Sequence, residues 1–240
     1  MFEERKYREW IKAYGFIASV VSYKESDLFI LARDDVKPDA EGLLLEARKD
    51  IEEYIMRDAK YLTALEPHVP NNDAPLIIRR MADSAARFGV GPMAAVAGAI
   101  SDYVGEQLWL KTGDVIVENG GDIFVRCGRP LIFALYAGET SLFTGKVKFT
   151  VRSNGKPVGI CTSSATVGHS LSFGKADAVC VISTSAAEAD AAATAFCNMI
   201  QNTSDIELVI RTAQKYDSIR GVIAAMNDKL GIWGDVELIP

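Results

Sequence analysis

The sequence predicts an α+β protein, with a largely antiparallel sheet and packed helices forming a single compact unit of two intimately joined lobes. Apolar residues at helical spacing dominate much of the first half, and alternating strand patterns with glycine turns begin at Asp114. One capped helix and a closing hairpin follow. Because the strands are grouped rather than alternating one by one with helices, the pattern excludes a Rossmann fold and favours antiparallel pairing.

The N-terminal part, residues 1–74, is expected to be a strand and helix extension to the region 75–240. Within it, Leu44, Ile51 and other apolar residues recur at helical spacing and predict an amphipathic helix over residues 38–61. A proline-rich stretch containing Asn71 and Asn72 follows. Apolar periodicity resumes at once after it, so it indicates a loop rather than a linker between domains.

Two helices are predicted next, over Leu76–Phe88 and Met93–Leu110. Between them lies the glycine-rich bend Phe88–Pro92, the first place where a backbone could approach a ligand, and Gly91 is a candidate cofactor-binding residue there. The meander that follows has these predicted strands: Val115–Val117, Ile123–Arg126, Leu131–Tyr136 and Val147–Val151.

The last third begins with a hydroxyl-rich segment, Cys161–Ser172, and continues with a strand over Ala178–Ser183. Ser185 followed three residues later by Glu188 is a capping box, which predicts a helix start. We expect Asp190, Thr194 and Asn198 to share one face of this alanine-rich helix, because residues four apart are neighbours. The tail predicts a hairpin of Gly221–Met226 with Gly231–Ile239.

Composition excludes several classes of function. The chain has 240 residues, 49% of them hydrophobic, and a net charge of -6 without basic clusters, so we expect no nucleic-acid partner. The first residues are charged where a signal peptide is apolar, and the longest apolar stretch, 89–100, is too short to span a bilayer. We therefore expect a cytoplasmic protein without a membrane partner.

The four cysteines are widely spaced, which argues against a zinc or iron–sulfur site. Cys161, which we expect in a loop or at a strand end, is the one candidate reactive cysteine. Hydroxyls or a helix terminus nearby could lower the pKa of its thiol, and the alternative is an inert buried thiol. His169, between Gly168 and Ser170, is a candidate general base, a phosphate contact or an exposed loop residue.

Three segments have the composition of ligand-facing backbone: 89–95, 118–122 and 161–170. Each has an ordinary explanation alone, since Asn119-Gly120 between strands is also a hairpin turn. In their order along the chain, however, they resemble the ApbE-like superfamily, which includes the flavin transferases. Residues 91–96 resemble its Gly-Gly-Ile-Ala-Lys-Gly, residues 117–123 its Asn-x-Gly-Gly-Asp-Ile, and residues 189–195 its Ala-Asp-Ala-x-x-Thr-Ala.

The resemblance implies an ApbE-like fold, a Mg²⁺ site and a pocket for FAD or a related nucleotide. The metal would be held by the carbonyl of Ala94 and the side chains of Asp190 and Thr194, an all-oxygen set that suits a hard cation. The expected catalytic residues are His169 and Cys161. The expected cofactor-binding residues are Gly91, Asn119, Gly120, Gly121, Asp122, Thr162, Ser163 and Ser164.

The sequence also departs from the transferases. Ala95 stands where they carry a Lys, and residues 169–174 replace their His-x-x-Asp-Pro-x-Thr-Gly, which removes charge complementarity at a diphosphate site. The Gly-His-Ser-Leu-Ser-Phe-Gly-Lys-Ala-Asp-Ala run at 168–178 resembles a subfamily of short, functionally uncharacterised ApbE-like proteins. Some of its members are associated with sulfur assimilation, in homocysteine formation.

Three functions follow as hypotheses. The first is a transferase-like enzyme of the ApbE superfamily with a metal-assisted pocket for a nucleotide, flavin or other anionic small molecule. The second is a non-catalytic protein that binds a ligand or delivers sulfur or flavin to a partner enzyme or redox protein. The third is a structural subunit with a vestigial pocket. The alanine-rich helix and the terminal hairpin also suggest a homodimer.

Overall fold

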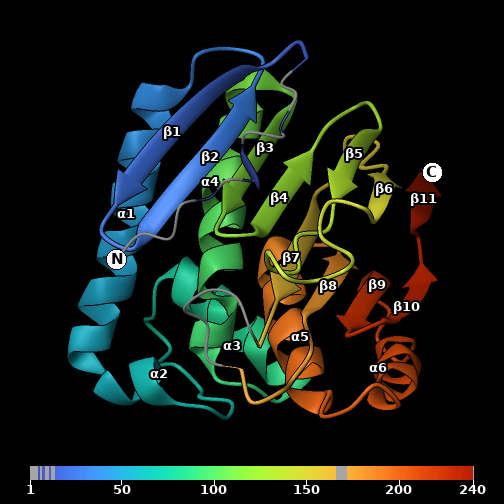
Figure 1. Cartoon of the computed structure of the whole chain (residues 1–240). Helices are drawn as coiled ribbons and strands as arrows, with labels where there is room; N and C mark the ends of the chain where they lie inside the picture. The colour runs from blue at the N-terminus through green and yellow to red at the C-terminus, as the bar shows by residue number, and fades with distance from the viewer. Residues whose placement is uncertain (1–4, 6, 9–10, 12–13, 166–171, 240) are drawn as a thin grey trace.

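Eight antiparallel strands form the central sheet of the computed structural model, which describes residues 5, 7–8, 11, 14–165 and 172–239. The strand order is β1-β2-β3-β4-β7-β8-β9-β10 (Figure 1). These strands are β1 (Ile17–Tyr23), β2 (Ser26–Ala32), β3 (Val115–Asn119), β4 (Asp122–Arg126), β7 (Val158–Ser163), β8 (Ala178–Ser183), β9 (Ile219–Met226) and β10 (Lys229–Gly234). A second sheet, in the order β11-β6-β5, contains β5 (Leu131–Ala134), β6 (Lys148–Val151) and β11 (Glu237–Ile239).

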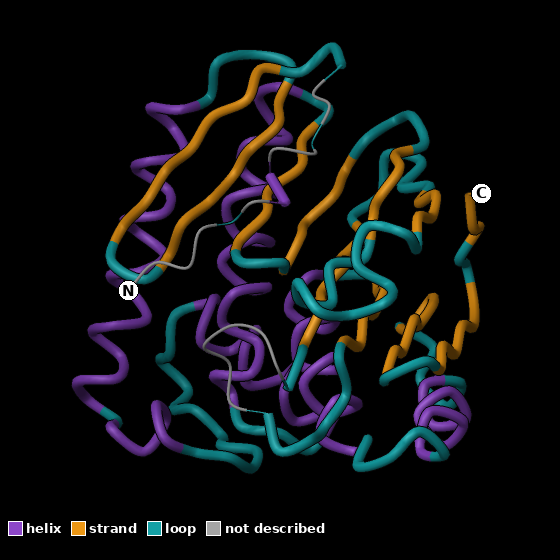
Figure 2. Tube along the Cα trace, viewed as in Figure 1, coloured by secondary structure: helices purple, strands orange, loops and turns teal. Residues whose placement is uncertain are grey.

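Helices cover one face of the central sheet, and the small sheet lies against its other face (Figure 2). The helical elements are α1 (Lys37–Arg57), α2 (Ala59–Thr63), α3 (Leu76–Phe88), the 3₁₀ helix η2 (Pro92–Ala95), α4 (Val96–Thr112), α5 (Ala186–Met199) and α6 (Asp205–Ala213). Among the described residues, no helix is long and apolar enough to cross a membrane. The elements and their strand order confirm the predicted α+β class and its antiparallel sheet.

Strand alternation divides the interior into two apolar cores that share the sheet. On the helical side Val117, Phe124 and Val181 pack beneath α4 and α5. On the opposite side Val125 and Ile160 pack against the small sheet. Because side chains alternate between faces, each central strand contributes to both cores.

The structure corrects several predicted elements. Within residues 1–74, β1 pairs with β2 and β2 pairs with β3, so both strands belong to the central sheet. The tail is not one long hairpin: its second strand ends at Gly234, where φ is +88°, and β11 then pairs with β6 in the other sheet. The predicted helix over Met93–Leu110 begins instead as η2 and becomes α-helical from Val96 to Thr112.

Helix α5 begins at the predicted capping box. The backbone N–H of Glu188 donates to Ser185 Oγ at 3.2 Å, which satisfies one of the helix's unpaired donors. The Glu188 carboxylate does not complete the reciprocal half. It instead pairs with Arg87 at 2.6 Å and accepts from the hydroxyls of Ser183 and Thr184.

We predict that Ser185→Ala lowers the free energy of unfolding by about 1 kcal/mol, because it removes this cap. Ser204→Ala is the matched control, since Ser204 precedes α6 without a side-chain bond to that helix. Urea unfolding of both variants measures the difference. Equal losses of stability in the two variants would contradict the capping role.

Candidate functional site

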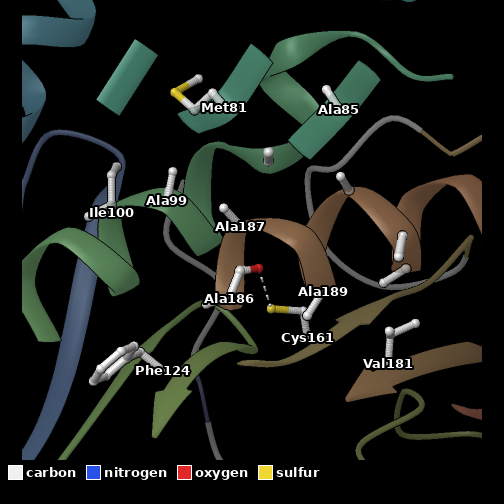
Figure 3. Packing of buried hydrophobic residues seen from close by; sticks show 14 of the residues in the cluster. Met81, Ala85, Ala99, Ile100, Phe124, Cys161, Val181, Ala186, Ala187 and Ala189 are labelled. Carbon is white, nitrogen blue, oxygen red and sulfur yellow. Dashed lines mark hydrogen bonds between the residues drawn. The ribbon is translucent and has the colours of Figure 1, made fainter. Parts of the chain in front are cut away.

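The N-terminal turns of α4 and α5 cross in very close contact. A Cβ added to Gly98 in α4 would lie 2.2 Å from the carbonyl oxygen of Ala186, the first residue of α5. Alanines around the crossing, including Ala99, Ala187 and Ala189, keep the side chains small (Figure 3). Gly and Ala at these positions therefore allow two helix starts, each rich in unpaired backbone N–H groups, to meet at one place.

Each helix start is capped by a carboxylate from the other helix. Asp190 Oδ2 in α5 accepts from the N–H of Gly98 at 2.9 Å. Asp102 in α4 accepts from the N–H groups of Ala186 and Ala187 at 2.8 and 3.0 Å, one with each oxygen. We call this arrangement of Asp102, Asp190 and their backbone donors the reciprocal cap. It satisfies helix donors and places negative charge at the positive ends of two helix dipoles.

A third carboxyl group, Asp122, stands next to the reciprocal cap. It begins β4, directly opposite Cys161 of β7, on the helical face of the sheet. Burial and then the charge of Asp190 raise the pKa of Asp122 well above its usual value. The pKa of Asp190 is also raised by burial, and the N–H groups of Gly98 and Ala97 oppose that shift.

Asp102 is the most deeply buried of the three acids, at 1% exposure. Burial raises its pKa to about 7, although its two backbone donors favour the ionised form. The three carboxyl groups, each with a raised pKa, lie close together around the crossing of α4 and α5.

The glycine turn between β3 and β4 lies at the same end of the sheet as Asp122. Gly120 and Gly121 have φ values of +68° and +99°, which L-residues with side chains rarely adopt. Asn119 is buried and donates from Nδ2 to the carbonyl of Ala97 at 3.3 Å, so it ties the turn to the start of α4.

Glu118 is held by an N-terminal segment that the sequence interpretation did not connect to the site. Its carboxylate accepts from Gly121 N at 2.8 Å, from Tyr7 Oη at 2.8 Å and from Arg8 Nε at 2.7 Å. Arg5 lies within 3.3 Å of the position that a Gly120 Cβ would take. Glu118 is therefore buried, and its carboxylate ties the turn to the N-terminal segment.

The three residues expected to bind the metal lie on two elements that contact each other. η2, which contains Ala94, packs against α5, which contains Asp190 and Thr194. All three are partly exposed, as a ligand site requires. Asn198, one turn beyond Thr194, accepts from Phe173 N at 2.8 Å and so fixes the chain at the end of the 161–172 segment.

Gly91 has a packing role at its position. A Cβ there would lie 1.7 Å from the carbonyl oxygen of Ala64, so the glycine allows η2 to approach the chain after α2. Ser163 is buried, and its Oγ has no hydrogen-bond partner within the described chain. Thr162 points to the opposite face of β7 from Ser163, because neighbouring strand residues alternate. Ser164, which follows β7, is buried as well.

Cys161 was expected in a loop or at a strand end, and the structure corrects this. It lies inside β7, is 0% exposed, and its thiol donates to the carbonyl of Ala186 at 3.2 Å (Figure 3). Burial first, then the nearby charges of Asp122 and Asp190, raise the pKa of the thiol. These conditions favour the inert buried thiol over a reactive thiolate. His169 lies outside the described residues.

Oxygen atoms are the donors that Ala94, Asp122, Asp190 and Thr194 could offer to a cation. No group of three or more His, Cys, Asp and Glu side chains with metal-site geometry occurs within the described ranges. A site here would therefore combine the carboxylates of Asp122 and Asp190 with neutral oxygens such as the Thr194 hydroxyl and the Ala94 carbonyl. Hard cations such as Mg²⁺ accept this mixture, with water completing the shell.

The fold is that of ApbE proteins. The structure resembles the apo flavinyl transferase ApbE of Pseudomonas stutzeri with a TM-score of 0.55, 15% identity, and coverage of 91% of this chain and 94% of that one. It resembles the ApbE protein of Thermotoga maritima with a TM-score of 0.56, 12% identity, and coverage of 92% and 97%. At these identities the likeness concerns the fold alone.

Sequence comparison gives the family directly. The family model described as "AbpE bacteria" matches residues 8–221, and the chain belongs to that family. The UPF0280 protein MJ1526 of Methanocaldococcus jannaschii is 43% identical over 202 residues, covering 82% of each chain. A UPF0280 protein of Methanosphaerula palustris is 40% identical over 222 residues, covering 89% of each. The resemblance drawn from the sequence motifs is therefore confirmed.

Proposed function

We propose that this protein binds a phosphate-bearing nucleotide, with FAD as the first candidate, through a divalent cation held by Asp190, Asp122, Thr194 and the Ala94 carbonyl. The observation that carries the proposal is the closeness of two buried carboxyls, Asp122 and Asp190: after burial, the charge of Asp190 is the largest cause that raises the pKa of Asp122. A divalent cation offsets that repulsion.

The reciprocal cap supports an indirect mode of phosphate binding. Helix N-termini ordinarily attract phosphate, but the N–H groups of Gly98, Ala186 and Ala187 already donate to carboxylates. A phosphate arriving at this crossing therefore meets carboxyl oxygens in place of free N–H donors. A metal ion bound there reverses the local sign and becomes the group that receives the phosphate oxygens.

Ala95 bears on which chemistry follows binding. The transferase motif has a Lys where this chain has Ala95, so no cation from that position would hold a diphosphate here. Structural neighbours are named as flavin transferases. We propose metal-dependent ligand binding as the retained activity, with the cation supplying the positive charge that a Lys would otherwise provide.

The sulfur-delivery alternative lacks support from the cysteines. A persulfide carrier needs a thiolate that a partner can reach. All four cysteines, Cys127, Cys161, Cys180 and Cys197, are buried.

Calorimetric titration of metal-free protein with FAD, with and without Mg²⁺, tests the proposal. We expect binding only with Mg²⁺, and its loss in Asp190→Ala, because that variant removes the proposed carboxylate ligand that Gly98 N orients at 2.9 Å. Asp217→Ala is the matched control, since Asp217 is exposed on the loop before β9.

Each outcome is decisive. Equal FAD affinity with and without Mg²⁺ would refute the metal-mediated mode. Undiminished Mg²⁺-dependent binding by Asp190→Ala would remove Asp190 from the site. No binding by the folded parent protein under either condition would refute FAD as the ligand.

A further inference from the structure

The two halves of the reciprocal cap connect parts of the chain that are far apart in sequence. Asp102 lies 84 and 85 residues from its donors, Ala186 and Ala187, and Asp190 lies 92 residues from Gly98. Each carboxylate leaves its own helix and caps the other. Sliding or rotating α5 against α4 would therefore break hydrogen bonds at both helix starts together.

Asp102 does more than an ordinary helix cap requires. Helix α5 already has the local cap Ser185, which accepts from Glu188 N. Burying a carboxylate at 1% exposure has a desolvation cost, and a neutral apolar residue at position 102 would avoid it. Capping of α5 alone therefore does not explain why an acid occupies position 102.

The geometry connects Asp102 to the proposed metal ligand. Ala186 and Ala187 lie four and three residues before Asp190, so the two donors held by Asp102 are one helical turn from the Asp190 side chain. Fixing that turn sets the direction of the Asp190 carboxylate. Oxygen Oδ2 of Asp190 is meanwhile held by Gly98 N, which orients the remaining oxygen.

We propose that Asp102 is a positioning residue for the divalent-cation site: by pinning the first turn of α5 against α4 it presents the Asp190 carboxylate to the metal. This inference rests on the proposed metal-binding function. It assigns a role to a residue of α4 that none of the sequence motifs contains. Metal binding at Asp190 and capping by Asp102 are then linked, so each strengthens the other.

Asp102→Asn tests the proposal, because the amide keeps the shape but replaces one acceptor with a donor facing a backbone N–H. We expect Mn²⁺ affinity, measured by EPR of free Mn²⁺, to fall at least ~10-fold, the size typical when a residue that orients a metal ligand is lost. Ser185→Ala weakens the same helix start but leaves the reciprocal cap intact. Its Mn²⁺ affinity should stay within about 2-fold of the parent.

The outcomes separate this inference from the function beneath it. Tight Mn²⁺ binding by the parent and by folded Asp102→Asn alike would overturn the positioning role alone. Equal losses in Asp102→Asn and Ser185→Ala would also overturn it, since general loosening of α5 would then be the cause. A parent that binds no Mn²⁺ would overturn the proposed function and this inference together.

A measurement on the parent protein covers the case in which Asp102→Asn does not fold. In an NMR titration with Mg²⁺, the amide signals of Gly98, Ala186 and Ala187 should shift with one common midpoint, because the two caps respond as a unit. Movement of the Gly98 amide while the Ala186 and Ala187 amides stay unchanged would contradict the linkage.

Discussion

Gly98→Ala is expected to lower the free energy of unfolding by about 3 kcal/mol, a large effect for one added methyl group. The new Cβ would lie 2.2 Å from the Ala186 carbonyl oxygen and 2.9 Å from the Ala187 nitrogen. Both are backbone atoms of a buried helix start, so neither can rotate away as a side chain would. The helices must separate, which also lengthens the bonds of the reciprocal cap.

The opposite effect on stability is expected for Gly42→Ala, which also replaces a glycine inside an α-helix. Gly42 lies inside α1, is exposed, and has open space where a Cβ would project. Alanine there should raise the free energy of unfolding by about 0.5–1 kcal/mol through its better helix propensity. Urea unfolding measures both variants. A Gly98→Ala protein as stable as Gly42→Ala would show that the crossing tolerates a wider separation.

Local sequence signals account for the elements that were predicted well. Helix α3 and strand β8 have the predicted bounds, Leu76–Phe88 and Ala178–Ser183. The Ser185 cap also forms as predicted. Each of these rests on residues within a few positions of one another, which a single sequence displays directly.

Contacts between distant segments account for what was missed. Cys161 looks like part of a loop because hydroxyl residues follow it, yet pairing with β4 on one side and β8 on the other makes its segment the central strand β7. The residues near Cys161 in the sequence do not indicate which strands will pair with its segment. Helix α6 was overlooked although Ile206 and Val209 form its buried side, a periodicity that the sequence does contain.

The candidate site likewise combines features that the local sequence predicts with features that depend on contacts between distant segments. The shared face of Asp190 and Thr194 is a property of one helix and could be predicted. The approach of Asp122 depends on the register of β4 against β7, and the role of Asp102 depends on an interhelical crossing. An acid placed among Ala99, Ile100 and Val104 in a largely apolar helix was nevertheless a visible signal, because buried carboxylates require partners.

Asp122→Asn should stabilise the metal-free protein while weakening its binding of metal. In the parent, burial and the charge of Asp190 raise the pKa of Asp122, and burial raises the pKa values of Asp190 and Asp102. The folded protein therefore holds protons that the unfolded chain releases near pH 4. The contribution of these carboxyl groups to the free energy of unfolding is fully present below that pH, and it is lost as the pH rises toward about 7.

The amide removes one ionisable group and its repulsion of Asp190. At pH 8 we expect Asp122→Asn without metal to exceed the parent in free energy of unfolding by on the order of 1–3 kcal/mol, with a smaller difference at pH 5. Mn²⁺ affinity should fall by ~10-fold or more, because each lost carboxylate charge weakens a hard-cation site.

Urea unfolding with chelator at pH 5 and pH 8, together with Mn²⁺ titration at pH 8, measures both halves of this prediction. Asp217→Asn, at an exposed position, should change neither quantity. A stable variant that keeps full Mn²⁺ affinity would place Asp122 outside the metal's reach. A destabilised variant at pH 8 would mean that the carboxylate pair contributes to the stability of the metal-free fold. The opposite signs expected for stability and binding are typical of charges kept together for a cation rather than for the fold.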